Sequence, residues 1–468
     1  MSTARALIDL EISRAWLVDP YARREGPGEI VVRDGVLESV TWLEGREADG
    51  IDDRGVVVAP GFIDLHAHFR EPGNRAAETI ASGLAAAAHG GFTSVCLMPN
   101  TSPAMDQPWL LAGLRAAVEA SGSPLEVLAY GTATAGRAGE QLAGLGAMAD
   151  AGVVGFSDDG APIASATIFR SALAYAGMLG LPVVDHPEEG SLTDGAEAND
   201  GLVATVLGLR GWPSVAEAIA VGRDLALLAD VVREVPTARL HLTHLSTPES
   251  LDLVRRAKAA GLPVTCDITP HHLALTDEWL AGSRRLAWDA LDDRGERRDP
   301  WLDGVLEAPP YETSLRVNPP LRSPADAAAC LAALLDGTAD AIATDHAPHT
   351  EVDKDVEFGL AANGISGIET ALGLVLEAVD AGRLPLAIAV AALTAGPARV
   401  LGSRADGRPR GLVEGECANL VVVDRSARWL VTAEGLASNG KNSPLLGREL
   451  PGSVLATVAD GRLAYEAP

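Results

Sequence analysis

Short runs of Val, Ile, Leu and Phe alternate with longer segments rich in Ala and Leu through the central part of the chain. Such short, bounded apolar runs are typical of buried strands, and the segments between them are typical of helices. The expected strands are Phe62–His66, Thr93–Met98, Leu125–Tyr130, Val153–Ser157, Pro182–His186, Leu240–His244, Pro263–Ile268 and Ala341–Asp345. Gly90, Gly91 and Gly180 mark helix ends just before a strand. The pattern predicts an α/β fold, a closed (β/α)8 TIM barrel over residues 59–400.

The two ends of the chain lack a long helical pattern. Near each end, apolar runs flank an Asp-Gly pair, which is a hairpin signature. The runs are Gly28–Gly35 with Val36–Trp42, and Asn419–Asp424 with Val454–Tyr465. We expect residues 1–58 and 401–468 to join in a small composite β-sandwich domain beside the barrel.

Composition narrows the class of partner. The formal net charge is −27, and a field of that sign repels nucleic acids and anionic membranes, so we expect neither. An anionic substrate would need a cation close by. The N-terminus carries Asp9 and Glu11 and lacks the basic-then-apolar pattern of a signal peptide, and no apolar run reaches the roughly 18 residues of a membrane span. The cysteines Cys96, Cys266, Cys330 and Cys417 are widely spaced; we expect them to be reduced and buried in a cytoplasmic protein.

Residues 281–308 interrupt the alternation with clusters of charge. The clusters are Arg284-Arg285, Asp292-Asp293-Arg294 and Arg297-Arg298-Asp299. We expect a solvated surface excursion, with a partner-binding element as the alternative.

The run that ends in His66-Ala-His68 carries the first candidate chemistry. Side chains alternate across a strand, so His66 and His68 point the same way. Two imidazoles on one side of a strand end can reach the same divalent cation. A pair of histidines that merely cap a core strand is the alternative.

Other expected strands end in similar residues. His186 and His244 end two of them, Asp345 ends another, and Asp158-Asp159 follows a fourth. The carboxyl ends of barrel strands converge on one face, where an active site forms. Imidazole and carboxylate together suit Zn²⁺, with other first-row metals as alternatives. The spacing therefore predicts a metal site at the barrel mouth.

Several motifs of the chain match those of a known protein family. They are Asp64-x-His66-x-His68-x-Arg70-x-Pro72-Gly73, Met98-Pro-Asn-Thr101, Phe156-Ser-Asp-Asp-Gly160, Val317-Asn-Pro-Pro-Leu-Arg322 and Ala343-Thr-Asp-His-Ala-Pro-His349. The chain resembles the amidohydrolase superfamily over nearly its whole length and, more narrowly, its bacterial class I dihydroorotases. The resemblance implies a centre of one or two zinc ions, with two favoured. The implied ligands are His66, His68, His186, His244, Asp345 and an aspartate after strand four, for which family spacing favours Asp159 and leaves Asp158 in reserve.

The resemblance also implies a reaction, the reversible cyclisation of N-carbamoyl-L-aspartate to L-dihydroorotate in pyrimidine biosynthesis. Asp345 would transfer the proton. Substrate contacts carry over to His68, Arg70, Asn100, Asn318 and His349, with the backbone at Asn363 and Gly364. Residues 349–362 form a long polar loop beside this site, and we expect a lid there.

Two other functions compete with this one. Hydantoinases, dihydropyrimidinases and allantoinases resemble the chain but bridge their metals with a carboxylated lysine after strand four, and here lysine occurs only at Lys258, Lys354 and Lys441. An inactive relative that scaffolds aspartate transcarbamoylase would have lost metal ligands, and every ligand position is filled. We expect an active homo-oligomeric enzyme, with a transcarbamoylase complex left open.

Overall fold

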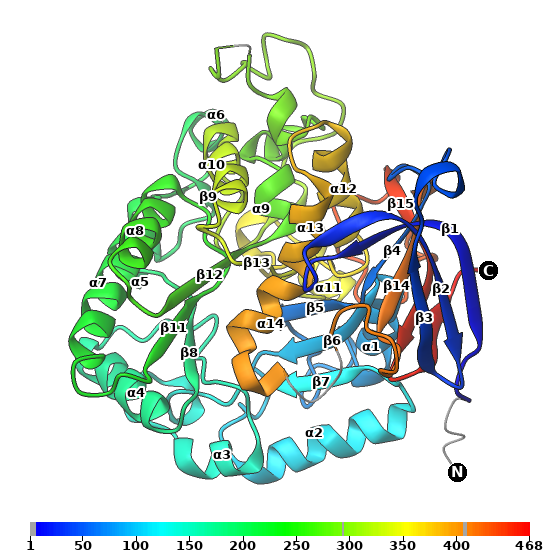
Figure 1. Ribbon diagram of the computed structural model, residues 1–468. Helices are drawn as coiled ribbons and strands as arrows, with labels where there is room; N and C mark the ends of the chain where they lie inside the picture. Colours follow the sequence, from blue (N-terminus) through cyan, green and yellow to red (C-terminus); the bar gives the residue numbers. More distant parts are fainter. Residues whose placement is uncertain (1–5, 293, 406–409) are drawn as a thin grey trace.

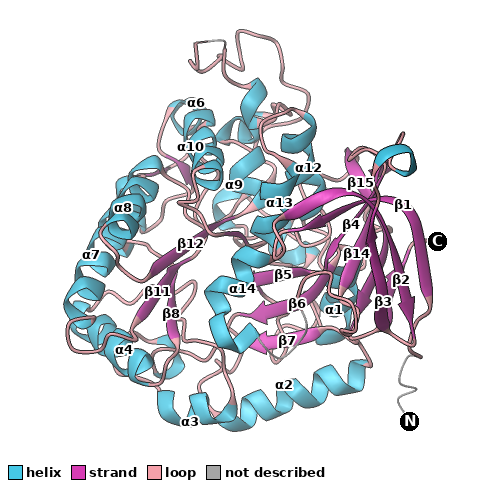
Figure 2. Ribbon diagram, viewed as in Figure 1, coloured by secondary structure: helices cyan, strands magenta, loops and turns pink. Residues whose placement is uncertain are grey.

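The computed structural model describes residues 6–292, 294–405 and 410–468. Figure 1 shows two parts, a barrel of strands inside a ring of helices and a β sheet that packs beside it and contains both ends of the chain. Colouring by secondary structure separates helices on the outside of the barrel from the strand-rich domain at its side (Figure 2).

The side sheet has seven strands in the order β16-β15-β14-β4-β1-β2-β3. They are β1 (Leu10–Asp19), β2 (Arg24–Arg33), β3 (Val36–Trp42), β4 (Val56–Pro60), β14 (Leu420–Leu430), β15 (Glu449–Ala459) and β16 (Arg462–Glu466). Both predicted hairpins are present: Asp34-Gly35 has φ of 47° and 74°, and Asp460-Gly461 has φ of 50° and 66°, the left-handed pair that a type I′ turn requires. The two turns abut, because a Cβ on Gly35 would lie 2.7 Å from the Gly461 carbonyl oxygen.

Alternation along these strands gives the sheet two apolar faces. Val57 and Val421 join the core shared with the barrel. Their neighbours Val58 and Val422 join a second cluster that extends from Leu37 of β3 to residues of β15. Because residues from opposite regions of the sheet meet in that cluster, the sheet closes on itself as the predicted sandwich. The division of the chain at residues 58 and 401 remains a proposal.

The barrel has seven regular strands. They are β5 (Phe62–Ala67), β6 (Phe92–Leu97), β7 (Glu126–Ala129), β8 (Pro182–Asp185), β11 (Arg239–Leu242), β12 (Val264–Ile268) and β13 (Ala341–Ile342). They pair in parallel as β5-β6-β7 and β13-β12-β11-β8. Phe156 joins the two sheets on one side through Gly131 and Val183, and His346 joins them on the other through Ala67. The predicted closed barrel is confirmed.

The fourth strand, expected at Val153–Ser157, has Phe156 as its one bridged residue. Its backbone hydrogen bonds nevertheless run from the Val154 amide, which donates to Ala129, to the Ser157 amide, which donates to Gly131. The backbone amides of Ala133 and Thr134, which follow β7, donate to the Asp158 carboxylate at 2.8 and 3.0 Å. A side chain thus occupies the amides that follow the last ladder hydrogen bond, so the pairing ends after Ser157.

Eight helices follow the strands and cover the barrel. They are α1 (Ile80–His89), α2 (Pro108–Ser121), α3 (Leu145–Ala151), α4 (Ala166–Met178), α7 (Val215–Val231), α8 (Pro248–Ala259), α10 (Pro324–Leu335) and α12 (Ala371–Asp380). Shorter elements are α5 (Gly190–Thr193), α6 (Leu202–Leu207), α9 (Pro270–Ala274), α11 (Glu351–Lys354), α13 (Leu386–Leu393), α14 (Ala395–Leu401), β9 (Ala198–Asn199) and β10 (Gly211–Trp212). The stretch Leu386–Arg404 is apolar and long enough to cross a membrane, but it is 61% buried inside the protein. Val400 and Leu401 share a cluster with Ile63 and Leu65 of the barrel interior, so this stretch is a core element.

The expectation of a solvated excursion is wrong for the first part of residues 281–308. Arg285 Nη2 donates to Glu278 at 3.1 Å, and Arg297 Nη2 donates to Asp277 at 2.7 Å. Both carboxylates are buried, and a buried carboxylate needs a paired cation. The charges that suggest solvation in the sequence therefore anchor the segment, while Leu302 further along is 84% exposed.

Candidate metal centre

His66 and His68 lie together at the carboxyl end of β5. Their ring centroids are 4.9 Å apart and their Nε2 atoms are 3.0 Å apart. Both side chains are buried. The alternation of the strand therefore places both imidazoles in the barrel mouth, as expected for side chains two residues apart.

Asp345 reaches the same pair from beyond β13. Its Oδ1 lies 3.1 Å from His68 Nε2 and 3.4 Å from His66 Nε2. Asp345 and His244 have φ of 46° and 43°, a left-handed conformation that few non-glycine residues adopt. Residues in such conformations cluster at functional sites, where the surrounding structure holds them.

The Asp159 carboxylate lies at the hub of the centre. It contacts one nitrogen of each strand-end histidine, with Oδ1 at 3.5 Å from His66 Nε2, 3.5 Å from His186 Nδ1 and 3.7 Å from His244 Nε2, and Oδ2 at 3.6 Å from His68 Nε2. His186 and His244 also approach each other, Nδ1 to Nε2, at 2.9 Å. Asp158 is turned away to the amides after β7. Of the two aspartates that the sequence leaves open, Asp159 is the one in the centre.

The donor set suits a divalent cation. Asp159 Oδ1 is buried and has no hydrogen-bond partner among the described residues. Burial raises the pKa of Asp159, but the charge of His66 and the nearby imidazoles of His186 and His244 outweigh it and hold the pKa well below its usual range. Two overlapping groups, His66/Asp159/His244 and His66/His68/Asp345, each bring three ligand atoms within 4.8 Å of one another. Buried imidazoles and carboxylates in this arrangement fit zinc.

A second set of residues holds the outer nitrogens of the imidazoles. His66 Nδ1 lies 2.8 Å from Thr243 Oγ1, and His68 Nδ1 lies 2.8 Å from Asn100 Oδ1. His186 Nε2 donates to Glu188 Oε2 at 3.0 Å. Such contacts fix the tautomer and leave the other ring nitrogen for a metal.

Glu188 and Thr243 contact the imidazoles of the centre, although the sequence does not single them out. Glu188 follows His186 by two positions, and a second acid, Glu189, follows it by three. Glu189 caps α5 by accepting from the Ser191 amide and hydroxyl instead. An acid shortly after a strand-end histidine is the available signal, and it cannot separate the two.

A cavity of about 200 Å³ opens above this cluster. Its lining includes every predicted metal and substrate residue except the deeper His66: His68, Arg70, Asn100, Asp159, His186, His244, Asn318, Asp345, His349, Asn363 and Gly364. Gly160 and Ala347 complete it. Gly364 has φ of 144°, and a Cβ there would lie 2.5 Å from the Ala347 carbonyl oxygen, so no side chain fits.

Arg70 gives this cavity its positive charge. Its Nε donates to the Pro348 carbonyl at 3.1 Å, and its Nη2 lies 3.3 Å from His349 Nε2. His349 Nε2 donates to the Asn363 carbonyl at 2.7 Å. Burial and the Arg70 charge lower the pKa of His349 to about 4, so this imidazole is neutral at pH 7. Among the described lining residues, Arg70 is thus the fixed cation that faces the cavity.

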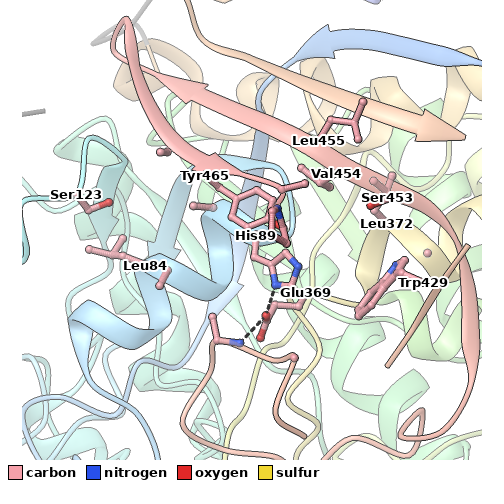
Figure 3. Close-up of a pocket in the computed structure, with 18 of the residues that line it drawn as sticks. Leu84, His89, Ser123, Glu369, Leu372, Trp429, Ser453, Val454, Leu455 and Tyr465 are labelled. Atoms are coloured by element: carbon pink, nitrogen blue, oxygen red, sulfur yellow. Dashed lines mark hydrogen bonds and ion pairs between the residues drawn. The ribbon is translucent and has the colours of Figure 1, made fainter. Parts of the chain in front are cut away.

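A larger cavity of about 840 Å³ lies between α1, α12, β15 and β16 (Figure 3). His89 Nδ1 contacts Glu369 Oε1 at 2.5 Å, and the imidazole lies beside Tyr465 and Trp429 at centroid distances of 4.7 and 5.9 Å. Among the described residues, no set of three possible metal ligands lies there. The smaller cavity at the strand ends carries the candidate chemistry.

Comparisons with known proteins find relatives over nearly the whole chain. Residues 55–250 match the family model described as dihydro-orotase-like. The chain is 43% identical over 453 residues to a dihydroorotase of Anaeromyxobacter dehalogenans (96% of each chain) and 42% identical over 465 residues to one of Pelotomaculum thermopropionicum (98% of each). An L-hydantoinase (dihydropyrimidinase) from Arthrobacter aurescens shares the fold, with a TM-score of 0.77 at 23% identity over 98% of this chain and 96% of that one.

Proposed function

The chain belongs to the dihydroorotase family of amidohydrolases, and we propose that it catalyses the reversible cyclisation of N-carbamoyl-L-aspartate to L-dihydroorotate in pyrimidine biosynthesis. One observation carries the proposal: the same small cavity holds a cluster of imidazole and carboxylate ligands and, among the residues around it, the guanidinium of Arg70. A cyclic amide that bears a carboxylate needs both features, an activated carbonyl and a cation for the carboxylate.

The metal would be zinc, held by the six strand-end residues His66, His68, Asp159, His186, His244 and Asp345. Two ions are supported over one because the ligands form two sets, His66/His68/Asp345 and the pair His186 and His244, and Asp159 contacts histidines of both. Zinc, when bound, polarises a carbonyl oxygen and lowers the pKa of water towards about 7.

Asp345 would move the proton. Burial raises the pKa of this carboxyl, but the charge of His66 and a hydrogen bond from His68 outweigh it and hold the pKa below its usual range. The carboxylate is therefore ionised at neutral pH and can accept a proton. In ring opening it would take the proton of the attacking water and pass it to the leaving ring nitrogen; in cyclisation it would take the amide proton.

The remaining cavity residues would bind the substrate. Arg70 would pair with its carboxylate through the two-pronged guanidinium. Asn100 and Asn318 would add amide contacts; their Nδ2 atoms donate to Asp159 at 3.3 Å and to Glu188 at 3.0 Å. His349 and the backbone at Asn363 and Gly364 would complete the pocket. Each of these residues lines the cavity.

A substrate panel tests the proposal. Purified protein is assayed with L-dihydroorotate, dihydrouracil, hydantoin and allantoin, before and after chelation and after zinc is restored. We expect turnover of L-dihydroorotate alone, lost with the metal and restored by zinc. Turnover of hydantoin or dihydrouracil would contradict the assigned substrate, and bound zinc without any turnover would favour a scaffolding subunit.

The cellular setting is also part of the proposal. All four cysteines are free, and Cys96, Cys266 and Cys330 are buried, which supports a cytoplasmic enzyme. Homo-oligomer formation and a complex with aspartate transcarbamoylase stay predictions.

A further inference from the structure

Lysine is rare in this chain. Of 37 Lys and Arg residues, only Lys258, Lys354 and Lys441 are lysines. All three donate to backbone carbonyl oxygens: Lys258 to Thr338 at 2.8 Å, Lys441 to Leu436 at 2.6 Å, and Lys354 to three carbonyls. A compact ammonium with three rotatable donors can serve carbonyls that converge from different directions, whereas a guanidinium donates only close to its own plane.

Lys354 bridges two segments that are remote in the sequence. It ends the short helix α11 and is only 6% exposed. Its Nζ donates to the carbonyls of Thr313 and Arg316 at 3.0 and 3.4 Å, and to that of Ala362 at 2.6 Å. The ammonium thus ties the chain before Asn318 to the chain before Asn363.

Arg316 strengthens the same junction. Its Nη1 donates to the carbonyls of Gly359 and Ala361, both at 2.6 Å. Its own carbonyl accepts from the Gly364 amide at 2.8 Å. We call Lys354, Arg316 and the carbonyls that they hold the carbonyl latch.

The latch lies directly behind the substrate side of the cavity. Asn318 follows Arg316 by two residues, and Asn363 and Gly364 follow Ala362; all three line the cavity. The Asn363 carbonyl also accepts from His349, whose ring lies beside Arg70. A shift of the segment at Ala362 would therefore move the carbonyl that holds His349 next to the guanidinium.

We propose that Lys354 is a positioning residue, whose ammonium sets the distance between the two segments that form the substrate side of the cavity. The inference rests on the proposed function only in taking L-dihydroorotate as the substrate. It also revises the expected lid over residues 349–362, because the latch fixes the middle and the end of that loop to the segment at 313–316.

The test compares Lys354→Met with Lys258→Met. Both remove a lysine that caps carbonyls, but Lys258 lies at the end of α8, where its ammonium holds the residues that precede β13 and also pairs with Asp340. For each variant and for the wild type we measure three quantities. They are the kinetic constants with L-dihydroorotate, the zinc content, and the rate of chymotryptic cleavage at Phe358 and Leu360. We expect Lys354→Met to raise KM about 10- to 100-fold, as sub-ångström to ångström misplacement does, with unchanged zinc content and faster cleavage. Lys258→Met should change neither KM nor cleavage.

Two further variants keep the test decisive. Lys354→Arg should give a KM between those of the wild type and Lys354→Met, because the planar guanidinium cannot reach all three carbonyls. If Lys354→Met does not fold, Arg316→Gln serves in its place, since it removes the bonds to Gly359 and Ala361. A KM within twofold of wild type together with unchanged cleavage would overturn the proposal, as would an equal KM change in Lys258→Met. A wild-type protein that does not turn over L-dihydroorotate would contradict the proposed function instead, while cleavage would still report on the latch.

Discussion

The cavity has two sides that are built in different ways. On the metal side, His66, His186 and Asp345 stand at or just beyond strand ends, and the barrel fixes their positions. On the substrate side, Asn318 and Asn363 lie on loops without regular structure. The metal side therefore depends on strand register, and the substrate side on hydrogen bonds between segments far apart in the sequence.

The two sides also differ in what supports them. Side chains such as Thr243 and Glu188 hold the imidazoles from behind. Backbone carbonyls held by Lys354 and Arg316 support the loops. We therefore expect substitutions on the metal side to change metal content, and substitutions on the substrate side to change KM with the metal retained.

The largest effect is expected for Asp159→Ala. The carboxylate contacts all four histidines at the hub of the centre, so its loss should remove bound zinc and lower kcat by on the order of 10³-fold or more. Elemental analysis and kinetics on the same preparation measure both. Full zinc occupancy in a folded Asp159→Ala protein would show that the hub lies elsewhere.

Asp345→Asn should have a smaller and different effect. The amide keeps an oxygen near His68 but cannot accept the proton, so kcat should fall about 10²- to 10⁴-fold while KM changes little. Steady-state kinetics in both directions check this. A change in KM alone would remove Asp345 from its proton-transfer role.

Arg70→Met tests the substrate side. Loss of a charge-assisted contact worth about 1.5–3 kcal/mol should raise KM about 10- to 100-fold, and zinc content should stay at the wild-type value. An unchanged Michaelis curve would contradict the role of Arg70, and loss of zinc would show that the two sides are not separable.

Glu188→Gln should weaken the metal side without abolishing it. The neutral Gln amide is a weaker acceptor for the His186 Nε2–H than the carboxylate is. Loss of such an outer contact lowers metal affinity about 10- to 100-fold. Competition with a chelator measures the zinc dissociation constant. Glu189→Gln, which changes an acid that only caps α5, is the matched control and should leave affinity unchanged.

Asp158→Ala should have the smallest effect on activity. Its carboxylate accepts from two buried amides, so removing it should cost about 1–3 kcal/mol of unfolding free energy with zinc retained. Denaturant unfolding measures the free energy, and loss of zinc in this variant would return Asp158 to the centre.

Most of the metal side can be predicted from the sequence. Alternation along Phe62–His66 places His66 and His68 together, and convergence of strand ends brings in His186, His244 and Asp345. Both hairpins are predicted because Asp and Gly tolerate the left-handed φ that a type I′ turn requires at its two central positions. These features depend on local chemistry and on the symmetry of the barrel.

Other features depend on distant partners that a single sequence cannot pair. The fourth strand ends after Ser157 because the Asp158 carboxylate accepts from the amides of Ala133 and Thr134. Arg285 and Arg297 in residues 281–308 turn inward because they pair with the buried carboxylates of Glu278 and Asp277. Asn318 and Asn363 are recognised through family resemblance, not through periodicity, because loops carry no repeating pattern.

Anomalous diffraction at the zinc absorption edge tests the central claim most directly. Crystals grown with zinc should show anomalous peaks among His66, His68, Asp159, His186, His244 and Asp345, with Asp159 in contact and Asp158 remote. A peak beside Asp158, or none within this cluster in protein that turns over L-dihydroorotate, would contradict the account.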